Sequence, residues 1–197
     1  MHKLIIFLLF MLVSFCTSEM LQYCSDSPGG YDPWQCIWHR GQVMTPSYNQ
    51  GTITSVSVYS TWNGSSSWLY RKHRIELWRY DGQLPYGKFF ETDVTVTPST
   101  YTGWTTTAVN TQWNGDYEDS FVAVFQGISL SGGSAWIESH IAIDGSILEP
   151  NRNWYTNSSE VWAISTYGDF MFRIVFTSPY EHVVESNSLG RVKSMFR

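Results

Sequence analysis

The chain of 197 residues has only three cysteines, and no two of them are separated by two residues. A Cys-x-x-Cys redox motif and a cysteine-based zinc site therefore receive no support. Lysine and arginine number 12 against 17 acidic residues, and the formal net charge is −5. Because nucleic-acid binding needs a cationic surface, this mildly acidic balance without a basic cluster argues against a nucleic-acid partner.

Long hydrophobic runs are also scarce, because only Leu4–Val13 is apolar throughout. This run is too short to span a bilayer comfortably, and polar residues follow it at once. We expect residues 1–18 to be a signal peptide that is cleaved after Ser18, which leaves a periplasmic, cell-surface or secreted protein without a transmembrane anchor. The alternative is a lipoprotein that is lipidated on Cys16, against which the bulky Phe15 argues.

Two cysteines remain after this cleavage, Cys24 and Cys36. An even number of cysteines in an exported protein predicts a disulfide, here closing a short ring worth about 3 kcal/mol. The alternative is two free thiols in a reducing compartment. The bridge would staple residues 19–40, a segment rich in Gly, Pro, Ser and Asp that we interpret as an N-terminal loop or short strand.

Turn-forming pairs divide the rest of the chain into short segments rich in Val, Ile, Thr and aromatic residues. Asn-Gly and Asp-Gly tolerate the positive φ that tight hairpins require. These pairs are Asn63-Gly64, Asp81-Gly82, Asn114-Gly115 and Asp144-Gly145. Regular turns between strand-like segments are typical of a sandwich or barrel.

Several segments alternate with period two, which is the pattern of a strand. Ile75 and Leu77 share one side of their segment, and the valines of 94–97 point inward together. Phe121–Phe125 is apolar on both faces, which predicts a central buried strand. Phe170–Phe176 places its aromatic residues on one face.

We therefore predict an all-β domain over residues 41–178, with about eight or nine strands. A single sheet would leave an apolar face in water, whereas two sheets packed face to face bury it. The expected fold is a two-sheet antiparallel, jelly-roll-like sandwich. Residues 179–197 form a linker and a basic C-terminal tail, which is either a frayed terminus or a tag that the secretion machinery reads.

The order of several sequence blocks resembles a known module. The blocks are Phe121–Gln126, Ile141–Asp144, Asn153–Tyr155, Trp162 and Gly168–Val175. They are similar to the jelly-roll-like accessory module of secreted bacterial proteins, which is often C-terminal to peptidases or cell-surface proteins. Ala142 departs from the pattern, since the module has glycine there. The resemblance implies a fold and export, but the module has no established chemistry.

Catalytic signatures are missing. The chain has no H-E-x-x-H, G-x-S-x-G, P-loop or G-x-G-x-x-G motif. Glu91-Thr92-Asp93 begins an E-x-D-x-x-E glycosidase pattern, but the third position is Val96. Glycoside hydrolysis needs two carboxyl groups at a fixed separation, and solvated strand carboxylates are the simpler interpretation of Glu91 and Asp93.

Polar and aromatic residues on one face of a predicted strand suggest a ligand site, and tryptophans in nearby loops could add platforms that stack on sugar rings. The candidate ligand-binding residues are Trp136, Glu138, His140, Asp144, Trp62 and Trp68. The alternatives are an exposed outer face and ordinary loop or core packing. His39 and His73 lack partners at ligand spacing, and we interpret them as surface residues.

One loop suggests a metal ion. Asp116, Glu118 and Asp119 crowd the segment after Asn114-Gly115, and oxygen-rich loops can hold calcium. The ligand set is incomplete, and the alternative is a solvated acidic loop. Calcium is the one cofactor that the sequence suggests.

Three functions remain open. The leading hypothesis is a non-catalytic secreted or cell-surface protein that acts by binding or display, with carbohydrate or another cell-surface component as its partner. The second is a small secreted polysaccharide hydrolase that uses Glu91, Asp93 and Glu138. The third is a structural component of an extracellular assembly that pairs through exposed sheet edges.

Overall fold

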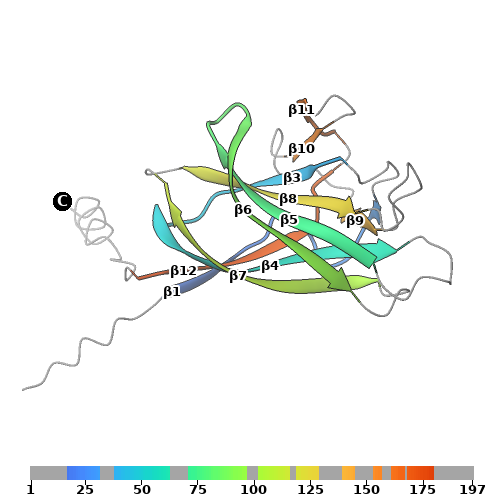
Figure 1. Cartoon of the computed structure of the whole chain (residues 1–197), viewed down its shortest axis with the longest axis horizontal. Coiled ribbons are helices and arrows are strands. Elements are labelled where there is room, and N and C mark those ends of the chain that lie inside the picture. The colour runs from blue at the N-terminus through green and yellow to red at the C-terminus, as the bar shows by residue number, and fades with distance from the viewer. Residues whose placement is uncertain are drawn as a thin grey trace, which may run out of the picture.

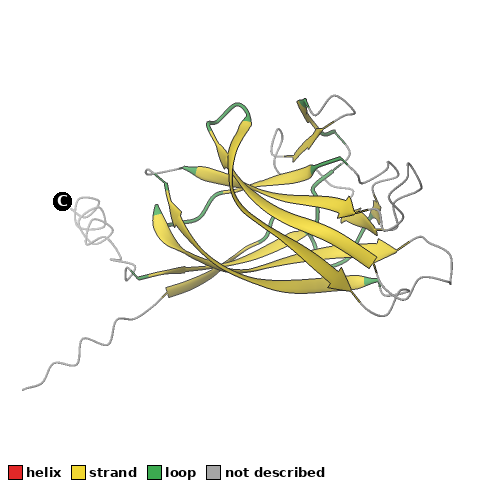
Figure 2. Ribbon diagram, viewed as in Figure 1, coloured by secondary structure: helices red, strands yellow, loops and turns green. Residues whose placement is uncertain are grey.

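The computed structural model describes residues 17–31, 38–62, 71–96, 102–115, 119–128, 139–144, 153–156, 161–166 and 168–179. These segments form strands and loops without a helix (Figure 2). It follows that none of them holds a helix long and apolar enough to cross a membrane. The expected signal peptide, apart from its last two residues, and the expected basic tail from residue 180 onward lie outside the described residues.

The strands belong to two sheets, and every pairing within them is antiparallel (Figure 1). The first sheet has the order β1 (Thr17–Leu21), β12 (Phe172–Ser178), β4 (Gln50–Trp62), β9 (Ser139–Ile143) and β2 (Gly30–Tyr31), and β7 (Gly103–Asn114) also pairs with β4. The second sheet has the order β11 (Trp162–Ile164), β10 (Asn153–Thr156), β3 (Arg40–Met44), β8 (Ser120–Ile128), β5 (Arg71–Tyr80) and β6 (Pro85–Val96).

The predicted two-sheet antiparallel sandwich is confirmed, and the described residues contain 12 strands; ten of these, β3 to β12, fall in the predicted domain, where eight or nine were expected. The additional strands are short: β1, β2, β10 and β11 have between two and five residues. So few residues give too few alternations for a period to stand out. Two of these strands lie in the segment 19–40 or at its start, where β1 pairs with β12 and β2 pairs with β9.

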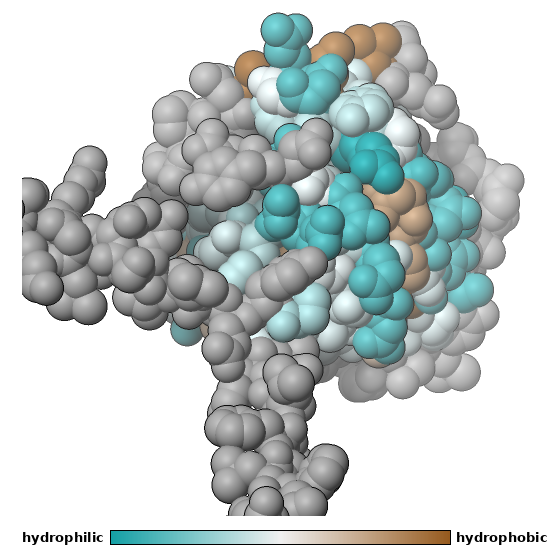
Figure 3. Space-filling model, turned by 90° about the vertical axis from the view of Figure 1, so that its left-hand side faces the viewer, coloured by the Kyte–Doolittle hydropathy of each residue, from teal (hydrophilic) through white to brown (hydrophobic). Residues whose placement is uncertain are grey.

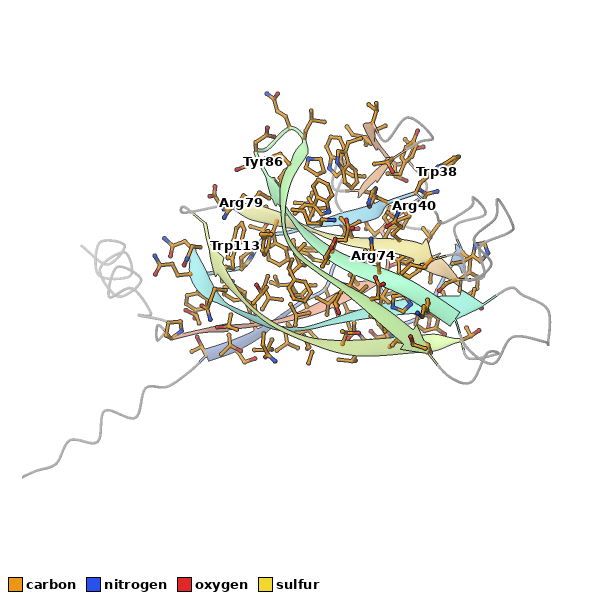
Figure 4. All side chains as sticks on the ribbon, in the orientation of Figure 1. Trp38, Arg40, Arg74, Arg79, Tyr86 and Trp113 are labelled. Atoms are coloured by element: carbon orange, nitrogen blue, oxygen red, sulfur yellow. The ribbon has the colours of Figure 1, made fainter. Side chains whose placement is uncertain are left out.

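The main core lies between the two sheets, and alternation predicts its members correctly. Ile75, Leu77 and Phe125 are buried there, as are the aromatic residues of β12. Trp113, which closes one end of this core, lies between the sheets in Figure 4. The whole of Phe121–Phe125 is buried, as expected for a central strand, so β8 must also be covered on its outer face.

The predicted disulfide between Cys24 and Cys36 is not found, because Cys24 is a free thiol. Cys36 lies outside the described residues. Cys24 is 8% exposed and packs against Ala142 and Met171, with its Sγ 3.8 Å from the carbonyl oxygen of Phe172. Burial raises the pKa of this thiol to about 12. The cysteine points into the protein and serves as a small apolar side chain, which is why it forms no bridge.

At one end of the sandwich, the exposed hydrophobic side chains of the described residues are scattered. Figure 3 views the end that carries the β7–β8 connection, and its hydrophobic side chains form small patches separated by hydrophilic ones. Scattered apolar residues of this kind are normal for a protein surface.

Candidate functional site

Half of the predicted ligand-binding residues cannot be placed. Trp136, Glu138 and Trp68 lie outside the described residues. Trp62 ends β4, where its backbone pairs with Ser139 of β9. Their role in ligand binding stays a prediction.

The described part of the predicted polar stripe is covered by the chain itself. His140 is half-buried, and Ala142, the next residue on that face, is fully buried under Cys24. Asp144 accepts hydrogen bonds from the backbone N–H and the hydroxyl of Ser25, the latter at 3.1 Å. In this structure Asp144 anchors the N-terminal segment over the first sheet.

The predicted calcium loop is only partly described. Asp116 and Glu118 lie outside the described residues, and Asp119 is exposed just before β8. Among the segments that the structure describes, no three His, Cys, Asp or Glu side chains gather closely enough to hold a metal ion. The calcium site stays a prediction.

The two carboxylates of the partial glycosidase pattern are held in ion pairs on β6. Asp93 accepts a hydrogen bond from Arg74 Nε at 2.7 Å, and Glu91 pairs with Lys88. Both carboxylates are exposed. These contacts agree with the simpler interpretation of Glu91 and Asp93 as solvated strand residues.

A more organised set of side chains lies on the outer face of the second sheet. Because successive side chains on a strand point to opposite faces, Glu76, Trp78 and Tyr80 point outward where Ile75 and Leu77 point into the core. The same register places Trp154 of β10 and Trp162 of β11 on the outer face. We call His39, Trp78, Tyr80, Trp154 and Trp162 the aromatic face.

The aromatic face rests on a floor of small apolar side chains. Val43, Val122 and Val124 are buried beneath it and form a second hydrophobic cluster, separate from the main core. Val43 and Val122 are partners in the β3–β8 register. This cluster explains why β8 is apolar on both faces: one side meets the other sheet, and the other side meets the aromatic face.

The rings come together because the sheet curls. β11 and β5 are four steps apart in strand order, which in a flat sheet would separate them by about 19 Å. The ring centroids of Trp78 and Trp162 are nevertheless 5.5 Å apart. In Figure 1, β10 and β11 stand above β3 and β8, on the same side as the β5–β6 hairpin. β10 and β11 at one edge of the sheet and the β5–β6 hairpin at the other therefore flank its outer face.

Gly41 leaves room for the valine floor beneath the rings. It lies on β3, on the same face as the valine floor. A Cβ atom built at Gly41 would lie 2.7 Å from Val122 Cγ1 and 3.6 Å from Cζ3 of Trp162. The first distance is shorter than real Cβ contacts, so a larger residue would force the valine floor to move, whereas 3.6 Å is an ordinary van der Waals contact with the ring.

A buried carboxylate organises the polar half of the site. Glu76 is 1% exposed, and its Oε2 accepts a hydrogen bond from Trp78 Nε1 at 2.7 Å. His39 Nε2 lies 3.3 Å from the same oxygen. Lys88 Nζ donates to Oε1 at 3.1 Å, pairs with Glu91, and lies 5.8 Å from the centroid of the Trp78 ring.

The charge of Glu76 is fixed by these contacts. Burial alone would raise its pKa, but the hydrogen bonds from His39 and Trp78, the charge of His39 and the hydrogen bond from Lys88 outweigh burial and lower the pKa to about 2. A carboxylate that stays ionised cannot act as a general acid near neutral pH. Glu76 therefore serves to orient its neighbours.

The orientation of His39 is also set by Thr156 of β10. The Oγ1 of Thr156 accepts a hydrogen bond from the backbone N–H of His39 at 3.0 Å and lies 3.2 Å from Nδ1. Nδ1 therefore faces Thr156 and Nε2 faces Glu76, so the ring can donate an N–H from Nε2 to the carboxylate. The imidazole is thus held between two partners, and its centroid is 5.5 Å from that of Trp162.

The sequence pattern did not predict the aromatic face, and the prediction that both histidines lie on the surface was wrong. His39 is largely buried within the aromatic face, and His73, also expected on the surface, is fully buried against Phe125 with ring centroids 5.0 Å apart. One signal was available: if Ile75 and Leu77 point inward, Trp78 must point outward. The same alternation predicts that Trp78 and Glu76 lie on one outer face.

Comparisons with known proteins assign neither a family nor a function to the chain. No family model matches the chain, and no curated protein matches it. The resemblance to the accessory module of secreted proteins accordingly stays a prediction from the sequence. The chemistry of the aromatic face is the observation from which a function can be inferred.

Proposed function

We propose that the protein is an exported, non-catalytic β-sandwich that binds carbohydrate through the aromatic face. Export is supported by the apolar segment Leu4–Val13 and the residues around it. The resemblance to an accessory module of secreted proteins points the same way. The ligand class is supported by the structure of the second sheet.

The observation that carries the proposal is the combination of aromatic rings and charged groups on an outer sheet face. A sugar ring offers a C–H face that stacks on an aromatic ring and hydroxyl groups that donate and accept hydrogen bonds. Trp78, Tyr80 and Trp162 keep part of their surface exposed. Beside them, the side chains of Lys88 and Glu91 are 34% and 50% exposed and can reach hydroxyl groups.

The hydrolase alternative is less well supported by the described residues. Hydrolysis of a glycosidic bond needs one carboxyl group that holds a proton near neutral pH. Glu76 is kept ionised, and it shares Lys88 with Glu91. Two carboxylates joined by one lysine are a poor acid–base pair, and the same arrangement suits an unreactive binding surface.

A glycan array followed by calorimetry tests the proposal. The mature chain should bind at least one glycan class, and Trp78→Ala and Trp162→Ala should each weaken that binding about tenfold, or about 1.4 kcal/mol. Tyr86→Ala is the matched control, because Tyr86 is 49% exposed on the same hairpin and is the register partner of Arg79, on the opposite face from Trp78.

Three results would contradict the proposal. Absence of binding to every glycan on the array would remove the ligand class. Binding that Tyr86→Ala weakens as much as Trp78→Ala would place the site elsewhere. Release of reducing ends from a bound polysaccharide by the purified protein, lost in Glu91→Gln, would favour the hydrolase instead.

A further inference from the structure

We infer that the aromatic face takes a single soluble glycan chain and does not bind the flat surface of a crystalline polysaccharide. This inference rests on the proposed carbohydrate-binding function and names the physical form of the ligand. It follows from the angles between the rings and from the contacts that fix those angles.

The rings of the aromatic face do not share a plane. The planes of Trp78 and Trp162 meet at 79°, and those of His39 and Trp78 at 71°. A flat surface can lie parallel to only one ring of a perpendicular pair. The edge of the other ring would meet that surface, and its stacking contact would be lost.

The remaining contacts within the aromatic face show the same feature. Tyr80 and Trp154 have ring planes at 60°, and His39 and Trp162 at 38°. Edge-to-face and tilted pairs are favoured between the rings themselves, because the positive edge of one meets the negative face of the other. The geometry that stabilises the cluster is thus the one that prevents a flat platform.

Specific contacts keep the rings from rotating into one plane. The indole of Trp78 is tied to the buried carboxylate of Glu76 through a 2.7 Å hydrogen bond. The Cζ3 atom of Trp162 lies 3.6 Å from the Cβ position of Gly41, so this ring packs directly against β3. Turning Trp78 would break a hydrogen bond to a buried charge, a loss that costs more than a neutral one.

A single glycan chain can stack on rings that are inclined to one another. Successive sugar units in a soluble chain are free to rotate about their glycosidic bonds, so different units can offer their faces at different angles. Hydroxyl groups on the same chain remain free to reach Lys88 and Glu91 at the rim. In a crystal the chains are locked parallel and most hydroxyl groups are already paired.

The test compares soluble and crystalline ligands with the full mature chain. Calorimetry would use hexasaccharides of β-1,4-glucan, β-1,4-xylan, β-1,4-mannan and β-1,3-glucan. Sedimentation assays would use microcrystalline cellulose and chitin. We expect at least one hexasaccharide to bind, about tenfold more weakly to Trp162→Ala, and the crystalline polymers to retain no more protein than they retain of Trp78→Ala.

A second variant separates the loss of a ligand contact from unfolding of the protein. Trp162→Phe keeps an aromatic ring at the position with a smaller face and should weaken hexasaccharide binding by a factor of about three, with an unchanged circular dichroism spectrum. Retention on cellulose or chitin that depends on Trp78 or Trp162 would overturn the inference and leave the proposed function standing. Binding to none of the soluble or crystalline glycans would instead remove the proposed function.

Discussion

The outer faces of the two sheets are shielded from water in different ways. Each sheet carries apolar residues on the side that points away from the main core. On the first sheet, the chain before β2 folds over these residues: Cys24 packs on Ala142 and Met171. Asp26 then ties this cover down through a 2.6 Å ion pair with Arg173 of β12.

On the second sheet, the cover consists of aromatic side chains instead of a separate segment of the chain. The valine floor lies beneath the aromatic face, whose rings close over it and keep part of their surface in water. A buried carboxylate holds these rings in place. On the first sheet a separate segment of the chain covers the apolar face, whereas the rings on the second sheet keep part of their surface exposed, and this is the surface that we propose binds carbohydrate.

The largest expected effect concerns the buried charge on the second sheet. Because the pKa of Glu76 is about 2 in the folded protein and 4.5 without its neighbours, its contribution to stability is complete above pH 4.5 and is lost as the pH falls toward 2. The loss should be about 3 kcal/mol. Urea unfolding between pH 6 and pH 2 measures it, with Glu76→Gln as the control that should lack this component. An equal pH dependence in both proteins would contradict the assignment.

The next effect concerns the cover of the first sheet. Cys24→Ser places a hydroxyl group among apolar side chains and should destabilise the fold by about 2 kcal/mol. In the native protein at pH 8, iodoacetamide should leave Cys24 unmodified, because its pKa of about 12 keeps the thiol protonated and burial blocks access. Peptide mass spectrometry reads the result. Rapid alkylation, or a peptide linked to Cys36, would show that the cover is not formed as described.

A smaller effect separates packing from charge on the first sheet. The guanidinium of Arg173 lies 3.8 Å from the centroid of the Trp104 ring and also pairs with Asp26, which is exposed. Arg173→Ala should cost about 1 kcal/mol through the lost ring contact, and Asp26→Asn should cost clearly less, because solvent screens this exposed charge. Thermal unfolding of both variants measures the difference. A larger effect from Asp26→Asn would mean that charge, and not packing, fastens the cover.

The smallest effect lies at the rim of the second sheet. Arg74 and Asp93 form an exposed ion pair across β5 and β6, and such pairs contribute between zero and about 1 kcal/mol. Arg74→Ala should therefore leave both stability and glycan binding almost unchanged. Urea unfolding and calorimetry test this. A clear loss of glycan affinity would extend the binding surface from the aromatic face to this pair.

Much of the fold could be predicted because alternation along one strand reveals which side is buried. The inward positions of Ile75 and Leu77 and the central place of Phe121–Phe125 were predicted correctly for this reason. The short strands β2 and β11 were not, because two or three residues carry no measurable period. The cysteine pairing failed because an even count of cysteines says nothing about where each thiol points.

The sequence by itself determined that this chain forms two packed sheets, since period-two burial is a property of each segment alone. It also contained every residue of the aromatic face. Only the tertiary structure decided that Trp162 meets Trp78 and that Glu76 lies between Trp78, His39 and Lys88. The physical reason is that alternation assigns a side chain to a face of its own strand, whereas contacts across strands depend on strand order, register and the curl of the sheet.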